Sequence, residues 1–506
     1  MTLLIENCRL DAGALASVRA DGGKISQVTR GTTEEIHNDV RRIDAGGATL
    51  LPGLTDSHSH PFEYGRSKRT LDLRGTSNIT SIRMRLAAAV HKTPPGGWVT
   101  GRGWDQEALS EGRLPCRQDI DDLSPKNPVV LTRVCGHIGL LNSSALASLG
   151  FEGQAGPLYD RDPSGTLTGI VREQALEAAL ARVPGRSAET CLEDLGVFEL
   201  EALKFGVATV HSIVSSGGYE EELKALEAAS RAGSLALRHR VYIPPEAVPF
   251  VSERDIGKSG PDFRIDGVKL YADGSLGART AALREPYLDM PDASGYLRYS
   301  DEELLSAVER FDSSGYQVII HAIGDRAVEQ AVDAIGSVAG NHNPRKHRIE
   351  HASLVPSDLR GRMRKHGILA TVQPMFAVSD SWAVQRLGEE RVRDLYPLRL
   401  MVEEGVVISG SSDSPVESVS PVLGMWASML DRGPERRGLK LADALALYTK
   451  NAGGLDVESA IRAGADANLT LFDADVEGIH PAMLRKVGVA ATVVGGVLAF
   501  SYEGSQ

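Results

Sequence analysis

The central part of the chain alternates short apolar runs with helix-like stretches, and this alternation limits the fold more than any other feature. Eight strand-like runs can be placed, at 49–54, 129–134, 207–213, 265–271, 317–321, 348–351, 368–372 and 406–409. Helix-like stretches such as 221–232 and 301–313 lie between many of them. Strands that alternate with helices form a parallel sheet. Eight of them favour an α/β fold of the closed (β/α)8 TIM-barrel type over an open sheet.

The two ends of the chain follow a different pattern, with short strands broken by turn signals such as 20–23 and 495–496. Neither end alone has enough strands for a stable sheet, so we expect both to join in one small composite β-sandwich. The expected domains are 1–54 and 455–506 for the sandwich and 55–454 for the barrel. Two oversized connections predict inserted lid segments at about 76–128 and 151–175.

Composition and charge exclude several classes of protein. The 506 residues carry a net charge of −12 and show no basic cluster, so neither nucleic acid nor an anionic membrane is expected as a partner. The four cysteines are far apart and form no CxxC pair, which is typical of a reduced cytoplasmic protein. No apolar stretch reaches the length of a membrane helix or forms a signal peptide. The sequence leaves open whether copies associate into a homo-oligomer.

The segment TDSHSH at 55–60 directly follows an apolar run and contains two histidines, His58 and His60. Side chains alternate in an extended segment, so both histidines point the same way and can hold one metal ion. The motif is short, and two unrelated loop histidines would look the same.

Four further candidate ligands lie in or just after later strand-like runs. His321 and His351 each end a run, Asp413 follows one, and Lys269 sits inside another, where a lysine is rarely buried without a partner. Each alone is more often a packed or capping residue. Together they bring histidines, a carboxylate and an amine to the same end of one barrel, which is where such barrels build their sites.

These residues, in this order along the chain, resemble the amidohydrolase superfamily of binuclear metal hydrolases. More narrowly, the chain resembles amidohydrolase family 3, the branch that includes N-substituted formamide deformylase and YtcJ-like proteins. The resemblance rests on GVKLYADGSLGARTA at 267–281, HAIGDRA at 321–327, RIEHA at 348–352 and GSSDSPV at 410–416, with further matches at GRGWD (101–105) and RVCGH (133–137). It covers nearly the whole chain and implies a barrel with a composite sandwich.

The resemblance also implies a ligand set. His58 and His60 would hold one metal ion, His321 and His351 a second, and Lys269 would be carboxylated to a carbamate that bridges both. A buried lysine has a lowered pKa, and the neutral amine is the form that reacts with CO₂. The alternative is a salt-bridged lysine beside a single ion. Histidine and carboxylate ligands favour Zn²⁺, and manganese or iron would fit the same residues. The expected cofactor is therefore a divalent metal, two per chain if Lys269 is carboxylated.

Two residues are expected to take part in catalysis. Asp413 would bind the first metal and carry a proton from water to the leaving nitrogen. His137 lies just beyond the run at 129–134 and would hydrogen-bond the carbonyl oxygen as negative charge develops there, or else anchor its own loop.

Further residues are candidates for supporting roles. Trp104 in a lid loop, His211 at the end of the run 207–213, and Arg279 in the loop after Lys269 are candidates for substrate contact. Asp273 is a candidate partner of Arg279. Asp325 is a candidate for orienting His321 from behind.

The sequence thus predicts a metal-dependent hydrolase that cleaves a C–N bond in a small amide-like molecule, such as an N-substituted formamide or an N-acyl compound. The same site would also suit a lactone, carbamate or ester. A protein of another class, a catalytically silent barrel acting as a scaffold or regulator, would be free to lose a ligand, and all six candidates are present.

Overall fold

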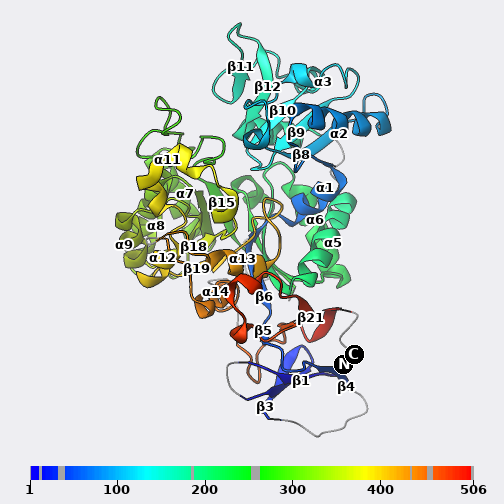
Figure 1. Cartoon of the computed structure of the whole chain (residues 1–506), viewed down its shortest axis with the longest axis vertical. Coiled ribbons are helices and arrows are strands. Elements are labelled where there is room, and N and C mark those ends of the chain that lie inside the picture. The colour runs from blue at the N-terminus through cyan, green and yellow to red at the C-terminus, as the bar shows by residue number, and fades with distance from the viewer. Residues whose placement is uncertain are drawn as a thin grey trace.

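The computed structural model describes residues 2–10, 14–31, 40–183, 187–251, 262–433, 436–452 and 460–502. Its centre is an eight-stranded, all-parallel sheet with the order β19-β18-β17-β16-β15-β14-β13-β6. The strands are β6 Leu54–Ser59, β13 Val207–Ile213, β14 Arg238–Ile243, β15 Phe263–Tyr271, β16 Gln317–Ala322, β17 Arg348–His351, β18 Leu369–Val372 and β19 Ile408–Gly410. Figure 1 shows the helices packed around them. The predicted (β/α)8 barrel is confirmed.

The predicted number of barrel strands is right, but two of the eight runs were assigned wrongly. The run 129–134 is β9 (Val129–Arg133) of a separate sheet, and the missing barrel strand is β14. The sequence of β14, RHRVYI, begins with three charged or polar residues and gives a weaker apolar signal. The first run was placed too early, because β5 (Leu50–Pro52) belongs to a terminal sheet and the barrel starts at β6.

The helices follow from local signals in the sequence. In α7 (Asp301–Ser313), the backbone nitrogen of Glu303 donates to the Ser300 hydroxyl, and the Ser300 nitrogen donates to the Glu303 carboxylate, which forms a capping box. Leu304, Val308 and Phe311 form its buried stripe. The larger barrel helices are α1 Pro61–Arg69, α5 Ala188–Lys204, α6 Tyr219–Ala232, α7, α8 Asp325–Ala339, α9 Ser357–His366, α13 Pro421–Ser428 and α14 Leu441–Tyr448; shorter ones are α10 Phe376–Ser379, α11 Ala383–Arg391, α12 Leu398–Glu403 and α15 Pro481–Leu484.

Two four-stranded sheets come from the ends of the chain and share one apolar core. The first has the order β3-β2-β1-β4, and in the second β20 pairs with β5, so that Leu471 faces Leu50. Their strands are β1 Thr2–Cys8, β2 Ala16–Asp21, β3 Lys24–Arg30, β4 Val40–Asp44, β20 Leu469–Phe472, β21 Val489–Val494 and β22 Val497–Ser501. The predicted boundary at 454–455 lies outside the described residues, and the exact domain limits stay a prediction.

A six-stranded mixed sheet is inserted between barrel strands β6 and β13, with the order β11-β12-β10-β9-β8-β7. Its strands are β7 Leu71–Asp72, β8 Val99–Trp104, β9, β10 Ile138–Leu141, β11 Tyr159–Arg161 and β12 Leu167–Arg172, with α2 Ile79–Lys92, α3 Ser143–Leu149 and α4 Glu173–Ala181. In Figure 1 it lies at the end of the molecule opposite the terminal sheets. The two expected lid segments are therefore parts of one inserted unit.

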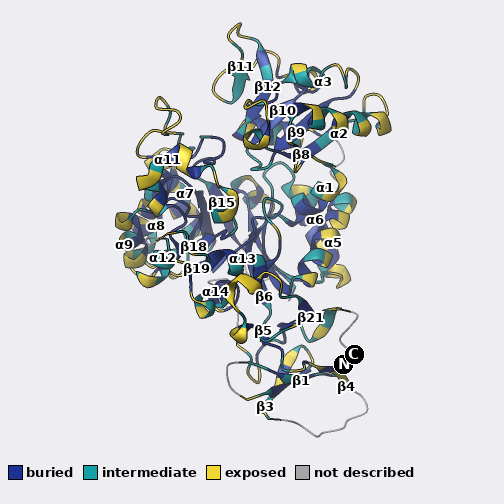
Figure 2. Ribbon diagram, in the orientation of Figure 1, coloured by how far each residue is buried: buried dark blue, intermediate teal, exposed yellow. Residues whose placement is uncertain are grey.

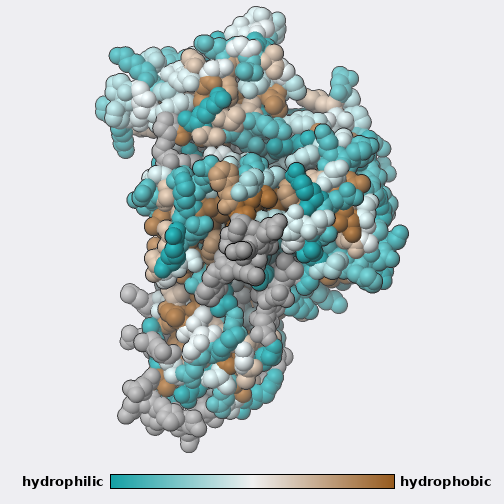
Figure 3. Space-filling view, turned by 180° about the vertical axis from the view of Figure 1, so that it is seen from behind, coloured by the Kyte–Doolittle hydropathy of each residue, from teal (hydrophilic) through white to brown (hydrophobic). Residues whose placement is uncertain are grey.

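Buried and exposed residues lie on different faces of the fold. Figure 2 shows buried strands inside the barrel and exposed residues on the outer faces of its helices. Seen from behind, most of the described surface is hydrophilic, with small hydrophobic patches across its middle (Figure 3). No helix within the described ranges is long and apolar enough to span a bilayer.

Candidate metal centre

The six predicted ligands lie at the carboxyl end of the barrel and are placed by five of its strands. His58 lies in β6 and His60 follows it. Lys269 lies in β15, His321 in β16 and His351 at the end of β17. Asp413 follows β19, which ends at Gly410 against the ring of Tyr448, where a Cβ atom would come within 2.5 Å of a ring carbon. This end of a (β/α)8 barrel is where active sites are built.

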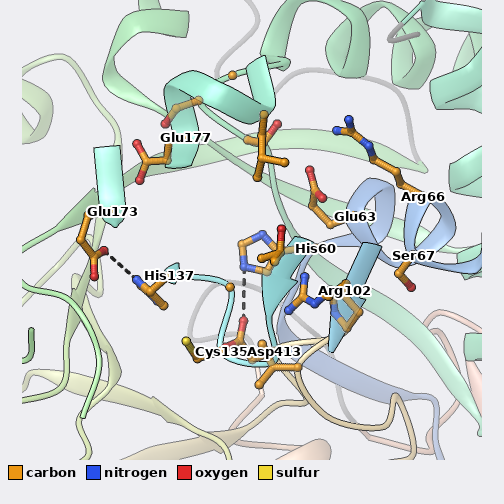
Figure 4. A pocket seen from close by; sticks show the side chains of 18 of the residues that line it. His60, Glu63, Arg66, Ser67, Arg102, Cys135, His137, Glu173, Glu177 and Asp413 are labelled. Atoms are coloured by element: carbon orange, nitrogen blue, oxygen red, sulfur yellow. Dashed lines mark hydrogen bonds and ion pairs between the residues drawn. The ribbon is translucent and has the colours of Figure 1, made fainter. Parts of the chain in front are cut away.

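Three of these residues form a compact cluster that could hold a metal ion. The Oδ1 atom of Asp413 lies 3.2 Å from Nε2 of His60 and 3.4 Å from Nε2 of His58. One ligand atom from each of the three residues can be chosen so that all lie within 4.8 Å of one another. Figure 4 shows His60 directed at Asp413. Two imidazoles and a carboxylate are a donor set suited to Zn²⁺ and similar divalent ions.

The other two histidines lie beside this cluster. The ring centroid of His351 is 5.0 Å from that of His58 and 4.5 Å from that of His321. Burial lowers the pKa of His58 to about 4 and of His351 to about 3, and it lowers the pKa of His321 well below its usual value. These histidines are therefore neutral at pH 7, which is the form that binds metals.

Lys269 gives a direct test of whether the site fits a metal-bound group. Its side chain is 1% exposed, and its Nζ atom has no hydrogen-bond partner among the described residues. Burial lowers its pKa to about 8, although the charges of Glu350 and Asp413 oppose this. The Nζ atom lies 4.9 Å from the centroid of the Tyr271 ring, but a buried amine without a hydrogen bond is still costly. A carbamate held by cations would remove that cost, so the donor set fits the predicted cofactor.

Buried side chains hold the histidines from behind. The Nδ1 atom of His58 is in very close contact with the carboxylate of Glu350, which also accepts from Nε of Arg348 over 2.5 Å. The Nδ1 atom of His351 lies 2.8 Å from Oε1 of Gln373. Contacts of this kind fix the tautomer and orientation of a metal-binding imidazole.

Sequence reasoning did not single out these supporting residues, although signals for them were present. Arg348 and Glu350 are charged residues inside a strand whose four residues are all buried, the same anomaly that drew attention to Lys269. Gln373 directly follows β18, at the same end of the barrel.

The support of His321 differs from the expectation. Its Nε2 atom lies 2.9 Å from the backbone oxygen of Gly274 and 3.5 Å from Oδ1 of Asp273. The Asp325 carboxylate instead accepts from the backbone nitrogen of Arg284. Asp325 begins α8, where a short side chain caps nearby backbone groups rather than reaching back to the strand. Asp273 accepts from the backbone nitrogens of Ala282, Ile323 and Gly324 and does not pair with Arg279.

His137 enters the site from the inserted sheet. Its Nδ1 atom lies 2.8 Å from Oε2 of Glu173, and its ring centroid is 5.5 Å from that of His321. The other Glu173 oxygen accepts from the hydroxyl of Thr280. Burial alone would lower the pKa of His137, but the charge and the hydrogen bond of Glu173, together with the charge of Cys135, raise the pKa to about 9. His137 is therefore a protonated hydrogen-bond donor facing the cavity (Figure 4).

Three residues expected to touch substrate lie elsewhere. Trp104 is 0% exposed in the core of the inserted sheet, where its Nε1 atom donates to the backbone oxygen of Leu131. Arg279 pairs with Asp289 over 2.7 Å. His211 is buried, and its Nδ1 atom accepts from Arg348. A residue inside a strand or loop pattern can face the core as readily as the cavity, and sequence alone does not separate the two.

The site opens into two cavities, of about 210 Å³ and about 150 Å³. Both are lined by the site residues His137, His321, His351 and Asp413. The inserted sheet contributes Arg102 and Cys135 to the larger one. The carboxyl end of the barrel and the inserted sheet thus enclose the candidate ligands together.

A barrel that carries this donor set at the ends of its strands defines a metal-dependent hydrolase. The family model described as "Amidohydrolase family" matches residues 41–500. The chain belongs to this family, in the branch called amidohydrolase family 3.

The relatives agree with this assignment. The chain is 30% identical to the putative amidohydrolase YtcJ of Bacillus subtilis over 482 residues, which cover 91% of each chain. It is 26% identical to the N-substituted formamide deformylase of Arthrobacter pascens in an alignment of 527 positions, which covers 97% of this chain and 95% of that one. The crystal structure of an uncharacterized metal-dependent hydrolase from Pyrococcus horikoshii OT3 is similar, with a TM-score of 0.77, 30% identity, and coverage of 95% of this chain and 99% of the other.

Proposed function

We propose that this hydrolase cleaves the C–N bond of a small amide-like substrate, such as an N-substituted formamide or an N-acyl compound. The observation that carries the proposal is the position of Asp413. Its Oδ1 atom lies within 3.4 Å of both His58 and His60, and the residue lines both cavities. A carboxylate so placed can bind a cation and exchange a proton with a reactant. The relative named as a formamide deformylase acts on a bond of this type.

The ligands are assigned as follows. His58, His60 and Asp413 would hold one divalent ion, and His321 and His351 would hold a second. Lys269 would react with CO₂ as its neutral amine, forming an N–C bond and releasing one proton, and the resulting carbamate would supply oxygen ligands for the ions. The lowered pKa of Lys269, about 8, supports this reaction. Zinc is the metal that this mixture of imidazole and oxygen ligands favours.

The chain's own groups supply proton transfer and charge stabilisation. When bound, divalent ions of this kind lower the pKa of water and polarise a carbonyl oxygen. Asp413 takes the proton from the attacking water and passes it to the departing nitrogen, so the water oxygen is left on the acyl carbon. His137, held protonated by Glu173, donates a hydrogen bond to the carbonyl oxygen as negative charge grows there.

The proposal also covers the kind of substrate, the location of the protein in the cell and the role of the inserted sheet. The substrate is a small molecule, and we propose a cytoplasmic location on the basis of the scattered cysteines in the sequence. The domain limits and the closing of the inserted sheet over the site as a lid are predictions from the sequence.

Metal analysis combined with matched substrates tests the proposal. The purified protein, supplied with Zn²⁺ and bicarbonate, is expected to hold two metal equivalents per chain and to hydrolyse N-benzylformamide or N-acetylglycine. Chelation should abolish this activity, and Zn²⁺ should restore it. Metal-dependent turnover of a lactone or ester with no amide turnover would replace the C–N assignment. A protein without stoichiometric metal would be the silent scaffold.

A further inference from the structure

The two cavities differ in chemistry and meet at the metal ligands. The larger one, which we call the polar chamber, extends towards α1 and the inserted sheet, past Arg66 and Arg102. The smaller one, which we call the aromatic chamber, extends towards α10 and α11 and is lined by Phe376, Trp382 and Tyr396. Because His137, His321, His351 and Asp413 line both, a bond held at the metal centre would have one substituent in each chamber.

The polar chamber presents positive charge that the described residues leave unpaired. The Nη1 atom of Arg66 is buried without a hydrogen-bond partner. Arg102 donates only to the backbone oxygen of Val134, over 3.3 Å. Within the described ranges, neither guanidinium is in an ion pair. Burial lowers the pKa of Arg102, and the charges of Glu63 and Asp413, neither of which is within ion-pair distance, offset this only in part.

The carboxylates of this chamber do not remove that charge. Glu173 is paired with His137, and Glu177 faces Arg298 over 3.4 Å. In Figure 4, Glu63 lies with Arg66 and Arg102 on one side of His60, and Glu173 and Glu177 lie on the other. Because we assign Asp413 to a cation, Glu63 is the labelled carboxylate that shares the first side with the two guanidinium groups. One further negative charge would balance them, and a guanidinium binds a carboxylate in bidentate geometry.

The aromatic chamber offers aromatic surface, and several polar groups beside it are hydrogen-bonded to one another. The Phe376 ring is parallel to the His351 ring, with centroids 6.2 Å apart. The hydroxyl of Tyr396 donates to Asp380, and Glu417 accepts from Ser379 over 2.6 Å. The volume of this cavity, about 150 Å³, gives room for a benzene ring beside Phe376 and Trp382.

From this arrangement we infer a substrate class for the hydrolase: an amide that carries a carboxylate on one side of the scissile bond and an aromatic ring on the other. Arg102 and Arg66 bind the carboxylate, and Phe376 and Trp382 contact the ring. An N-aroyl amino acid has this form. The inference rests on the proposed function for the reaction, but the recognition it describes can be measured without turnover.

Matched compounds test the charge. N-benzoylglycine and N-benzoylglycinamide differ by one carboxylate, and N-phenylsuccinamate and its carboxamide present the same difference with the amide reversed. Calorimetric binding is measured on the zinc-loaded Asp413→Asn variant, and turnover on the unaltered enzyme. In one of the two pairs, the compound with the carboxylate should bind about 10- to 100-fold more tightly than its neutral partner, because the carboxylate accepts two charge-assisted hydrogen bonds.

Two variants locate the chambers. Arg102→Gln should remove most of the carboxylate preference and leave binding of the neutral partner unchanged, whereas Arg231→Gln, an exposed arginine on α6, should leave both unchanged. Trp382→Ala should weaken N-benzoylglycine about 10-fold more than N-acetylglycine. Equal binding of charged and neutral partners, or equal loss from both in Arg102→Gln, would overturn the inference. Metal-dependent hydrolysis of amides without the carboxylate preference would overturn the inference and leave the proposed function standing. A carboxylate preference in binding, with no hydrolysis of any amide, would support the inference and overturn the proposed function.

Discussion

The backbone nitrogen of Asp413 donates to the backbone oxygen of His58 over 2.9 Å. The next bond, from the nitrogen of His60 to the oxygen of Ser414, has the same length. These bonds join the residues that follow the last barrel strand to the first strand. The two histidines and the carboxylate of the candidate metal site are therefore brought together by main-chain pairing.

Asp413→Asn should abolish most turnover and keep the fold. Asp413 has a left-handed φ of 50°, which asparagine adopts more readily than most residues. Asparagine offers an oxygen to a cation but cannot accept the proton. We expect kcat to fall about 10²- to 10⁴-fold, with zinc content and circular dichroism unchanged. A variant with nearly normal kcat would refute the proton role.

Lys269→Met should lower the metal content from two equivalents to one. The apolar side chain is tolerated in a buried position, but it cannot form a carbamate. Elemental analysis gives the stoichiometry, and NMR with isotopically labelled bicarbonate should show a carbamate signal that is absent from the variant. Lys204→Met, on the exposed face of α5, serves as the control. Two equivalents in Lys269→Met would exclude the bridging role.

His137→Gln should lower kcat about 10²- to 10³-fold, as expected for the loss of one donor to a developing oxyanion. Metal content should stay the same, because His137 is not among the proposed ligands. His321→Gln, by contrast, should lose metal. If His137→Gln loses metal and activity together, the residue is a ligand or a structural anchor.

Gln373→Met should weaken metal binding about 10- to 100-fold, because the Nδ1 atom of His351 loses its partner. The measurement is competition for zinc with a chelator of known affinity. Gln330→Met provides a matched control, since Gln330 is a buried glutamine on α8 that bonds to Tyr299 and Asp301 away from the site. Equal losses in both variants would point to general destabilisation.

Asp380→Asn should stabilise the protein at neutral pH. Burial raises the pKa of Asp380 to about 6, above the ordinary value of about 4. The folded state thus holds its proton more tightly than the unfolded state, and stability falls as the pH rises from about 4 to about 6. The neutral amide removes this loss, worth roughly 1 to 3 kcal/mol. Urea unfolding at several pH values measures it; a variant with the same pH dependence as the parent would refute it.

The barrel and the ligand order could be predicted because the periodicity and the strand-end positions are local features of the sequence. The mistakes concern β9 and β14. A fully buried strand in an inserted sheet carries the same apolar signal as a barrel strand. The polar start of β14 is explained only by partners far along the chain, as when Arg240 pairs with Asp266 of β15.

The supporting residues of the site were harder to predict, because they depend on which side chain fills a buried position behind each ligand. Asp273, not Asp325, lies near His321, since the loop after β15 folds back to place its carboxylate there. Trp104 lies in a segment that was expected to form a lid and contact substrate, yet its ring fills the core of the inserted sheet. Such choices between core and cavity are made by tertiary packing.

The pairing of β5 with β20 has a consequence for synthesis of the protein. A nascent chain leaving the ribosome has made Leu50 long before Leu471 exists to pair with it. Until Asp413 has also emerged, the chain holds two histidines of the first cluster without their carboxylate. Domains generally fold as units during translation. Here the terminal sheet that contains β5 and β20 and the candidate metal centre both need segments that are synthesised late. The proposed metal centre is therefore complete only after Asp413 has emerged, late in translation.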